Sequence, residues 1–182
     1  MGTALEGYSA GFPDAAKDAR LNLRNVLADS ELDERTRWAV ALASAHTLGD
    51  AALVEAVLEG AGAHADEAVR EDAQAAAVLM AMNNVYYRFR HFTGKAEYQR
   101  LPARLRMTRM AAPKTSKMTF ELLSLAVSAL NGCETCVQSH ETSLIALGET
   151  PERIHDAVRI AAVLASAHTA RGLAPASVRA SG

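Results

Sequence analysis

The chain has 182 residues, of which 49% are hydrophobic, and its formal net charge is only −2. This length suits one domain that buries a core without disulfide staples. The small charge gives no reason to expect binding to nucleic acid or to an anionic membrane. No apolar run approaches the roughly 18 residues of a membrane helix, and Met1–Gly11 lacks the basic and apolar segments of a secretory signal. We therefore expect a cytoplasmic protein without a membrane span.

Apolar side chains recur at helical spacing, with little of the alternation that strands need. We predict an all-α fold, with helices over residues 14–27, about 30–47, 51–58, about 66–87, about 119–130, 133–147 and about 150–171. The basic stretch 88–117 contains Pro102 and Pro113 and is expected to form short irregular helices. Residues 1–175 are predicted to form one domain, and residues 176–182 a flexible tail.

Local signals mark several of these boundaries. Ser30-Glu31-Leu32-Asp33 offers a cap for the second helix, and Thr150 followed by Pro151 is typical of a helix start. Asn131-Gly132 is expected to form a left-handed turn between the helices on either side of it.

The chain is predicted to contain two repeated helical halves, about 14–90 and 115–172. A shift of 83 positions superposes Trp38–Leu58 on Glu121–Glu141 and places Gly49 on Gly132. In this register Leu53 and Val57 take the places of Cys136 and His140. Only the C-terminal half then carries the cysteine chemistry.

Both cysteines lie in one short run, Cys133-Glu134-Thr135-Cys136-Val137-Gln138-Ser139-His140. On a helix, a C-x-x-C pair sets two sulfurs about one turn apart, within reach of a disulfide. Such a disulfide closes almost no loop, so a redox or metal role is expected rather than a structural one. His140 follows Cys136 by four residues and shares its helix face, where an imidazole can accept the thiol proton.

The residues alone leave open which thiol attacks. Cys133 is expected near a helix N-terminus, where the helix dipole favours a thiolate. Cys136 instead has His140 as its neighbour one turn further on. The first argument favours Cys133 as the nucleophile and the second favours Cys136.

The preceding helix carries polar residues at the same spacing as Cys133, Cys136 and His140. Glu121, Ser124 and Ser128 fall at i, i+3 and i+7 on an otherwise apolar segment. Two helices joined by a tight turn commonly pack antiparallel, which would bring Glu121 close to His140. A carboxylate there can orient the imidazole and relay protons. The alternative is a solvated glutamate in the first helical turn.

A zinc site is the main alternative of another class. Cys133, Cys136 and His140 could supply three ligands, with Glu121 or water as the fourth. No second C-x-x-C or histidine pair accompanies them in the sequence. For Asn83, Asn84 and the neighbouring tyrosines, we expect helix–helix hydrogen bonding and packing.

Glu121, twelve residues before Cys-x-x-Cys-x-x-x-His, resembles the pattern of the carboxymuconolactone-decarboxylase-like fold group and, more narrowly, of the alkyl hydroperoxidase D (AhpD) family. The resemblance extends to Met82-Asn83-Asn84-Val85-Tyr86-Tyr87-Arg88, and to the segment from Phe120-Glu121-Leu122 through Ala126-Val127-Ser128-Ala129 to Asn131-Gly132-Cys133. It covers most of the chain. Decarboxylases of the wider group lack the cysteine pair, so its presence argues against that activity.

The resemblance implies an all-helical subunit, usually a homotrimer, with weak alkyl hydroperoxidase activity. Its main role would be to reduce an AhpC-type peroxiredoxin through a transient interchain disulfide, with electrons from dihydrolipoamide on a lipoylated dehydrogenase component that dihydrolipoamide dehydrogenase recharges. No tightly bound cofactor or metal is expected. By the family pattern Cys136 attacks, Cys133 donates a proton and resolves the disulfide, and Glu121 and His140 relay protons. The basic stretch 88–109 could dock an acidic partner such as a lipoyl domain, although a solvated face is the commoner explanation.

The sequence departs from the family pattern at Thr135. A well-studied branch has a histidine just before the second cysteine, where this chain has threonine. A threonine hydroxyl can pass on a hydrogen bond but cannot hold a proton at neutral pH. The relay is therefore expected to be shorter here, and activity to be lower or shifted to higher pH.

Overall fold

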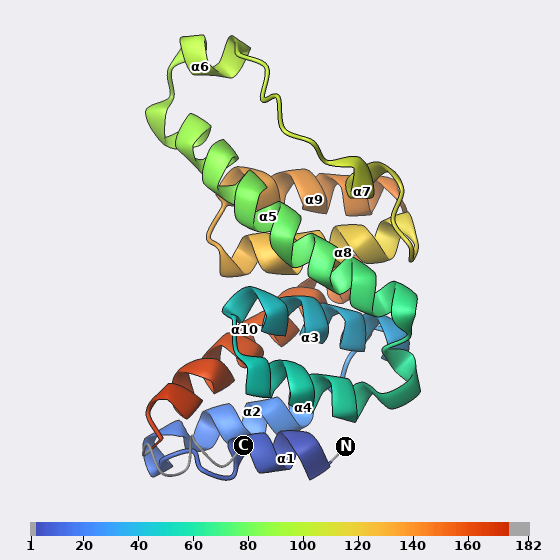
Figure 1. The fold of residues 1–182 in the computed structure, drawn as a ribbon, viewed down its shortest axis with the longest axis vertical. Coiled ribbons are helices and arrows are strands. Elements are labelled where there is room, and N and C mark those ends of the chain that lie inside the picture. Colours follow the sequence, from blue (N-terminus) through green and yellow to red (C-terminus); the bar gives the residue numbers. More distant parts are fainter. Residues whose placement is uncertain (1–2, 175–182) are drawn as a thin grey trace.

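The computed structural model describes residues 3–174, and every regular element over these residues is a helix (Figure 1). The predicted all-α fold is therefore confirmed. The first elements are α1 (Thr3–Ser9), the 3-10 helix η1 (Asp14–Ala16), α2 (Lys17–Val26), α3 (Glu34–Leu48) and α4 (Ala51–Ala61). They are followed by η2 (Gly62–His64), α5 (Glu67–Thr93), α6 (Ala96–Arg100), α7 (Thr108–Ala111), α8 (Lys117–Leu130), α9 (Glu134–Ala146) and α10 (Pro151–Gly172). The tail expected for residues 176–182 lies outside the described range.

The predicted helix starts at α3 and α10 are confirmed by their caps. The side chain of Asp33 accepts a hydrogen bond from the backbone N–H of Thr36 at 3.0 Å. At α10 Thr150 is the cap and Pro151 the first helical residue. Pro151 fits there because the first helical N–H has no partner within the helix.

The structure differs from the sequence prediction at α1 and at the end of α5. α1 was not expected, and its seven residues are too short to be stable alone. Tertiary contacts hold it, since Leu5 is buried and the Tyr8 hydroxyl donates to Asp50 at 2.7 Å. α5 continues past the predicted end at residue 87 to Thr93. It ends at Gly94, whose φ of 58° lies in the left-handed region that closes helices.

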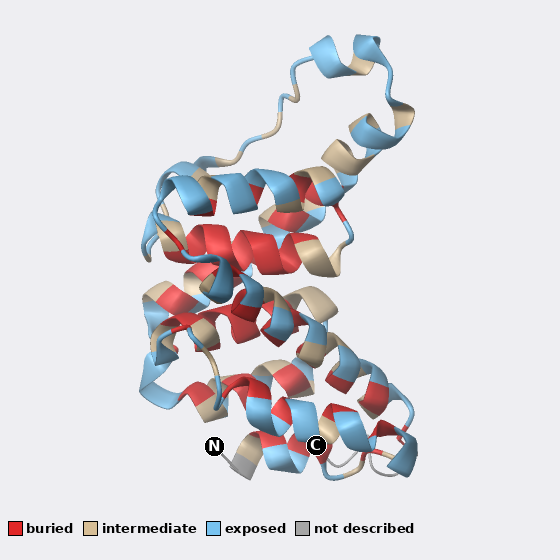
Figure 2. Cartoon of the chain, turned by 180° about the vertical axis from the view of Figure 1, so that it is seen from behind, coloured by how far each residue is buried: buried red, intermediate tan, exposed pale blue. Residues whose placement is uncertain are grey.

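Helices α3 and α8 form the centre of the molecule. Each packs against the other and against α5 and α10. Every residue of α3 from Trp38 to Ala45 is buried, and so is every residue of α8 from Thr119 to Ser128 (Figure 2). A helix that is covered on all sides must be apolar around its circumference, apart from polar groups that find partners. The polar residues of α8 are therefore informative about function.

The element bounds agree with the offset of the predicted repeat, although the repeat itself stays a prediction. Moved by 83 positions, the bounds of α3 and α4 become 117–131 and 134–144, next to those of α8 and α9. The end of α5 and α6 extend away from the other helices, and residues 101–107 return from them to α7 (Figure 1). Among the described helices, none combines the length and the apolar character required to cross a membrane.

Candidate functional site

The turn between α8 and α9 places Cys133 at the start of α9. Gly132 has a φ of 64°, which favours glycine, and the backbone N–H of Cys133 donates to the Ser128 carbonyl at 3.1 Å. Cys133 is the N-cap residue of α9. The predicted break at Asn131-Gly132 and the predicted position of Cys133 at a helix N-terminus are thus confirmed.

Asn84 of α5 hydrogen-bonds to the end of α8 and to the α8–α9 turn. Its Nδ2 donates to Ser128 Oγ at 3.0 Å, and its Oδ1 accepts from Asn131 Nδ2 at 2.9 Å. The Arg88 guanidinium donates to the Asn131 carbonyl. The expected helix–helix hydrogen bonding is confirmed for Asn84, and it holds α5 against the loop that carries Cys133.

The two sulfurs form a disulfide between residues with a Cα–Cα separation of 5.3 Å, within the usual range. The two cysteines differ in access. Cys133 is fully covered, whereas Cys136 lines a cavity and retains 7% of its exposure. The Thr135 hydroxyl lies 3.7 Å from Cys133 Sγ and lines the same cavity. A molecule in the cavity can therefore meet Cys136 but not Cys133.

Glu121 and His140 meet across the α8–α9 joint, as the stripe of polar residues suggested. His140 Nδ1 lies 2.6 Å from Glu121 Oε2, and both residues are buried. The rest of the α8 stripe behaves differently. Ser128 bonds to Asn84 of α5, and among the described residues nothing hydrogen-bonds to Ser124 Oγ. The alternative of a solvated glutamate is excluded, because Glu121 is only 4% exposed.

Lys117 completes the environment of the carboxylate. Its Nζ lies 2.7 Å from Glu121 Oε1, so the two carboxylate oxygens have one cationic and one imidazole partner. Burial by itself raises the pKa of the Glu121 carboxyl, but the hydrogen bonds from His140 and Lys117 outweigh it and hold that pKa below its ordinary value. Sequence reasoning missed Lys117, although its i, i+4 spacing to Glu121 on a helix was visible.

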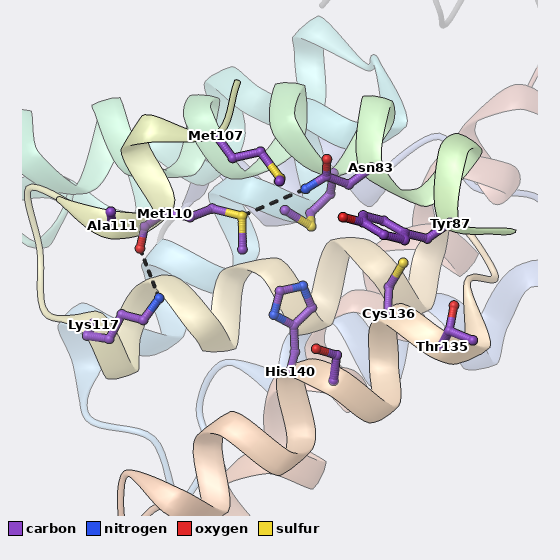
Figure 3. A pocket seen from close by; sticks show the side chains of 11 residues that line it. Asn83, Tyr87, Met107, Met110, Ala111, Lys117, Thr135, Cys136 and His140 are labelled. Carbon is purple, nitrogen blue, oxygen red and sulfur yellow. Dashed lines mark hydrogen bonds between the residues drawn. The ribbon is translucent and has the colours of Figure 1, made fainter. Parts of the chain in front are cut away.

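The ionised carboxylate sets the hydrogen-bonding state of the imidazole. A carboxylate only accepts hydrogen bonds, so Nδ1 of His140 must donate to Glu121. In neutral His140 the other nitrogen, Nε2, then carries the free lone pair. The His140 ring and the Cys136 side chain both extend into the cavity (Figure 3). The arrangement therefore places a nitrogen that can accept a proton in the same cavity as the accessible sulfur.

The cavity has a volume of about 680 Å³, enough for a molecule with an aliphatic chain. Its walls come from α5, from α7 and the residue before it, from the first residue of α8 and from α9. They comprise Met80, Asn83, Tyr87, Met107, Met110, Ala111, Lys117, Thr135, Cys136, Ser139 and His140 (Figure 3). Asn83 and Tyr87, for which helix–helix hydrogen bonding and packing were expected, line this cavity. The methionines were not predicted, because nothing in the sequence links them to the cysteines.

Residues 107–111 cover one side of the cavity, and we call them the roof. Polar contacts on both sides hold the roof in place. Arg109 pairs with Glu71 of α5 at 2.9 Å, and Lys117 Nζ donates to the Met110 carbonyl at 2.9 Å. The buried carboxylate of Asp72 accepts from the backbone N–H groups of Lys114 and Thr115 just after the roof. These contacts attach the roof to α5 and α8, so it is an ordered part of the cavity wall.

The structure gives the zinc alternative no support. In the disulfide form that the structure shows, neither sulfur is a thiolate that could bind a metal ion. Over residues 3–174, no three or more histidine, cysteine or acidic side chains are grouped as metal ligands would be. The structure instead brings the Cys133–Cys136 disulfide and the Glu121–His140 pair together at one cavity.

Comparison with known proteins agrees with this chemistry. The sequence profile of the carboxymuconolactone decarboxylase family matches residues 96–177. An "Alkyl hydroperoxide reductase AhpD" of Anaeromyxobacter dehalogenans strain 2CP-C is 51% identical over 171 residues, which is 94% of this chain and 92% of that protein. A protein of the same name from Coxiella burnetii strain RSA 331 is 45% identical over 96% of this chain and 97% of its own length. The chain belongs to the AhpD family.

Membership of the AhpD family confirms the resemblance inferred from the sequence. Another AhpD protein, from Anaeromyxobacter sp. strain Fw109-5, is 54% identical over 87% of this chain and 86% of its own length. The chain spans nearly the whole length of these relatives. The roles expected for Cys133, Cys136, Glu121 and His140 from the family pattern stay predictions about this chain.

Proposed function

We propose that this protein is a thiol–disulfide oxidoreductase that reduces an AhpC-type peroxiredoxin with electrons from dihydrolipoamide and has weak alkyl hydroperoxidase activity of its own. The observation that supports this most strongly is the position of the Cys133–Cys136 disulfide at a cavity lined by His140, with His140 bonded to buried Glu121. The names of the relatives agree with peroxide-linked redox chemistry.

In the reductive half-reaction a thiolate of the dihydrolipoyl group attacks Cys136 Sγ. The Cys133–Cys136 bond breaks, and Cys133 leaves as a thiolate at the N-cap of α9, where the helix dipole stabilises its charge. The second thiol of the donor then attacks the mixed disulfide. The lipoyl disulfide forms and the Cys136 thiol is released, so that two electrons and two protons pass to the protein.

In the oxidative half-reaction His140 takes the Cys136 proton, and the thiolate attacks a peroxide oxygen. The O–O bond breaks, an alcohol leaves, and Cys136 becomes a sulfenic acid. The Cys133 thiol condenses with it to restore the disulfide and release water. With an oxidised peroxiredoxin, Cys136 attacks the partner's disulfide, and Cys133 resolves the resulting interchain disulfide. Glu121 carries the proton relay together with His140.

The structure offers a physical reason for separate roles of the two sulfurs. Cys136 is the accessible sulfur and has His140 four residues away on the same helix, which suits the attacking thiol. Cys133 is covered and lies at the helix N-terminus, which suits a thiolate that leaves and returns without meeting solvent. The dipole argument for Cys133 and the base argument for Cys136 therefore support one mechanism.

The proposal includes a homotrimer that works in the cytoplasm with a lipoylated dehydrogenase component and dihydrolipoamide dehydrogenase. An apolar stripe on α5 supports self-association. It consists of Val78, Val85, Phe89 and Phe92, which share one helix face opposite the buried face of α5 and are 48–76% exposed.

The deciding experiment follows NADH oxidation with dihydrolipoamide dehydrogenase, lipoamide, an AhpC-type peroxiredoxin and an alkyl hydroperoxide, with each component omitted in turn. We expect NADH oxidation to stop without lipoamide and to fall strongly without the peroxiredoxin. Cys136→Ser should abolish both activities, whereas Cys133→Ser should trap the peroxiredoxin in a mixed disulfide. A Cys136→Ser protein that reduced peroxide at the parent rate would refute the assignment of the attacking thiol.

A further inference from the structure

Asn83 is a buried polar residue of the cavity that no described contact satisfies. It is 4% exposed, and among residues 3–174 nothing hydrogen-bonds to its Oδ1. Its Nδ2 has only the thioether of Met110, at 3.7 Å, and sulfur is a weak acceptor. A buried amide left in this state costs the folded protein free energy. Its position in the wall of the cavity gives it access to a bound molecule.

The neighbouring asparagine is the opposite case. Asn84 is 1% exposed, and both ends of its amide are hydrogen-bonded, to Ser128 and to Asn131. Asn84 is therefore explained by packing of α5 on the α8–α9 turn. Asn83 is not explained by packing, because a leucine of similar shape would fill the same space without an unpaired oxygen.

The position of Asn83 along α5 indicates which part of a ligand it meets. The later part of α5 lies against the start of α9, since Arg88 donates to the Asn131 carbonyl and His91 pairs with Glu134. Asn83 lies five residues before Arg88 and eight before His91, roughly 8–12 Å along the helix axis. There it contacts the roof through Met110 (Figure 3). A ligand whose reacting group is at Cys136 therefore extends from the start of α9 toward the earlier part of α5. The polar group that Asn83 recognises lies several bonds from the reacting group.

The chemistry of the wall defines that ligand. Met80, Met107, Met110 and Ala111 suit an aliphatic chain, and Asn83 offers one acceptor and one donor side by side. A carboxamide presents the complementary donor and acceptor. An alkyl hydroperoxide with its O–O group at Cys136 would instead place plain hydrocarbon beside the unpaired Oδ1.

We propose that Asn83 binds the carboxamide of the dithiol donor, with Oδ1 accepting its N–H and Nδ2 donating to its C=O in place of the Met110 contact. This inference rests on the proposed function and deepens it, because it names the part of the donor that the cavity recognises. The site thereby selects aliphatic dithiols that end in an amide over dithiols of equal reducing power without one.

The test compares dihydrolipoamide with its N,N-dimethyl amide, which has the same dithiol and chain but no N–H. Reduction of the Cys133–Cys136 disulfide is followed at varied donor concentration. In the parent protein we expect a KM for the dimethyl amide higher by roughly three- to tenfold, the effect of one neutral hydrogen bond, with kcat little changed. Asn83→Leu and Asn83→Ala should raise the KM for dihydrolipoamide by a similar factor and abolish the discrimination. Reduction by dithiothreitol, which has no amide arm, should change by a smaller factor in these variants than reduction by dihydrolipoamide does.

Stability provides an independent readout. Asn83→Leu removes an unpaired buried amide and should leave Tm unchanged or higher, whereas Asn84→Leu breaks two hydrogen bonds and should lower it. Equal KM values for the two amides in the parent protein, or discrimination that survives in folded Asn83→Leu and Asn83→Ala, would overturn the inference while the proposed function stands. A parent protein that dihydrolipoamide reduces no faster than dithiothreitol does would overturn both.

Discussion

Lys117 links the charge of Glu121 to the cover of the cavity. Its ammonium contacts Glu121 Oε1 and donates to the Met110 carbonyl, so one side chain holds both the carboxylate and the roof. The side chain is 45% exposed, so its position is determined by these two contacts and not by packing in the core. We infer that Lys117 is a positioning residue, which acts on the chemistry through Glu121 and His140.

The first prediction concerns Lys117→Met. Burial raises the pKa of Glu121 while the hydrogen bonds from His140 and Lys117 lower it, so loss of the lysine must raise that pKa. Protonated Glu121 no longer fixes the His140 tautomer, and the acid limb of the kcat/KM profile should therefore move to higher pH. We expect kcat/KM on the acid limb to fall by roughly two- to tenfold relative to the parent protein, with little change at the alkaline end, as part of the contribution of a general base.

A pH profile of peroxiredoxin reduction between pH 4 and 9 measures this effect. Lys114→Met is the matched control. Lys114 is an exposed lysine three residues before Lys117, and its hydrogen bond to Asp72 is made by the backbone N–H, which the substitution keeps. An acid limb at the same pH in Lys117→Met and in the parent protein would refute the role of Lys117.

The second prediction concerns Thr135, where this chain departs from the histidine of one branch of the family. The hydroxyl lies 3.7 Å from Cys133 Sγ at the cavity wall. Thr135→His adds a group whose ordinary pKa is about 6.5, so it can hold a proton near neutrality. We expect peroxide consumption at pH 7 to rise by roughly two- to tenfold. Thr135→Val, which removes the hydroxyl, should lower it; unchanged rates in both variants would show that this position carries no proton.

At the scale of the elements, close packing of α4 on α3 depends on a glycine. A Cβ built on Gly60 of α4 would lie 2.7 Å from the Trp38 ring of α3, and Trp38 is buried. Helical glycine is normally a defect, less stable than alanine by about 1 kcal/mol. Here the side chain of alanine would collide with a ring that cannot move into solvent.

The third prediction is that Gly60→Ala destabilises the protein. The collision should cost about 1–3 kcal/mol, which exceeds the gain in helix propensity. Urea unfolding measures the net loss. Gly7→Ala is the control, because Gly7 is also helical and a Cβ there would meet nothing within 4 Å. If Gly60→Ala stabilised the protein as much as Gly7→Ala does, the Trp38 ring would be able to move away from the added methyl group, and the prediction would be wrong.

At the scale of the whole molecule, α5 has two apolar faces. One face packs on α3, α8 and α9 and includes Val69, Ala73 and Met80. The opposite face carries the apolar stripe of Val78, Val85, Phe89 and Phe92. Large apolar side chains exposed along one helix face commonly mark an interface.

The fourth prediction is that the stripe mediates assembly. The parent protein should have three times the 19.3 kDa mass of one chain by light scattering, and Val85→Lys with Phe92→Lys should reduce it to that of one chain. The introduced lysines would be buried at the interface without a partner of opposite charge, which destabilises the assembly. Leu21→Lys, at an exposed apolar position on α2 away from the stripe, should leave the mass unchanged. A parent protein of 19.3 kDa would refute the homotrimer.

The sequence by itself determined the helical class, most helix starts and the four residues, Glu121, Cys133, Cys136 and His140, that the structure brings together. Caps such as Asp33 and Thr150 accept hydrogen bonds from N–H groups three residues away, so they can be predicted from the local sequence. The C-x-x-C pair and the base that follows it lie within two helical turns. The approach of Glu121 to His140 was also predictable, because a tight turn between two helices restricts their packing.

Only the tertiary structure decided which sulfur is accessible and what surrounds it. The partners are far apart in the chain: Asn84 and Asn131 are 47 positions apart, and Asn83 and Met110 are 27 apart. No periodicity in the sequence encodes such pairs, since they depend on how α5 and the roof pack against α8 and α9. α1 is missed for the same reason, because burial of Leu5 and the bond from Tyr8 to Asp50 stabilise a helix too short to form alone.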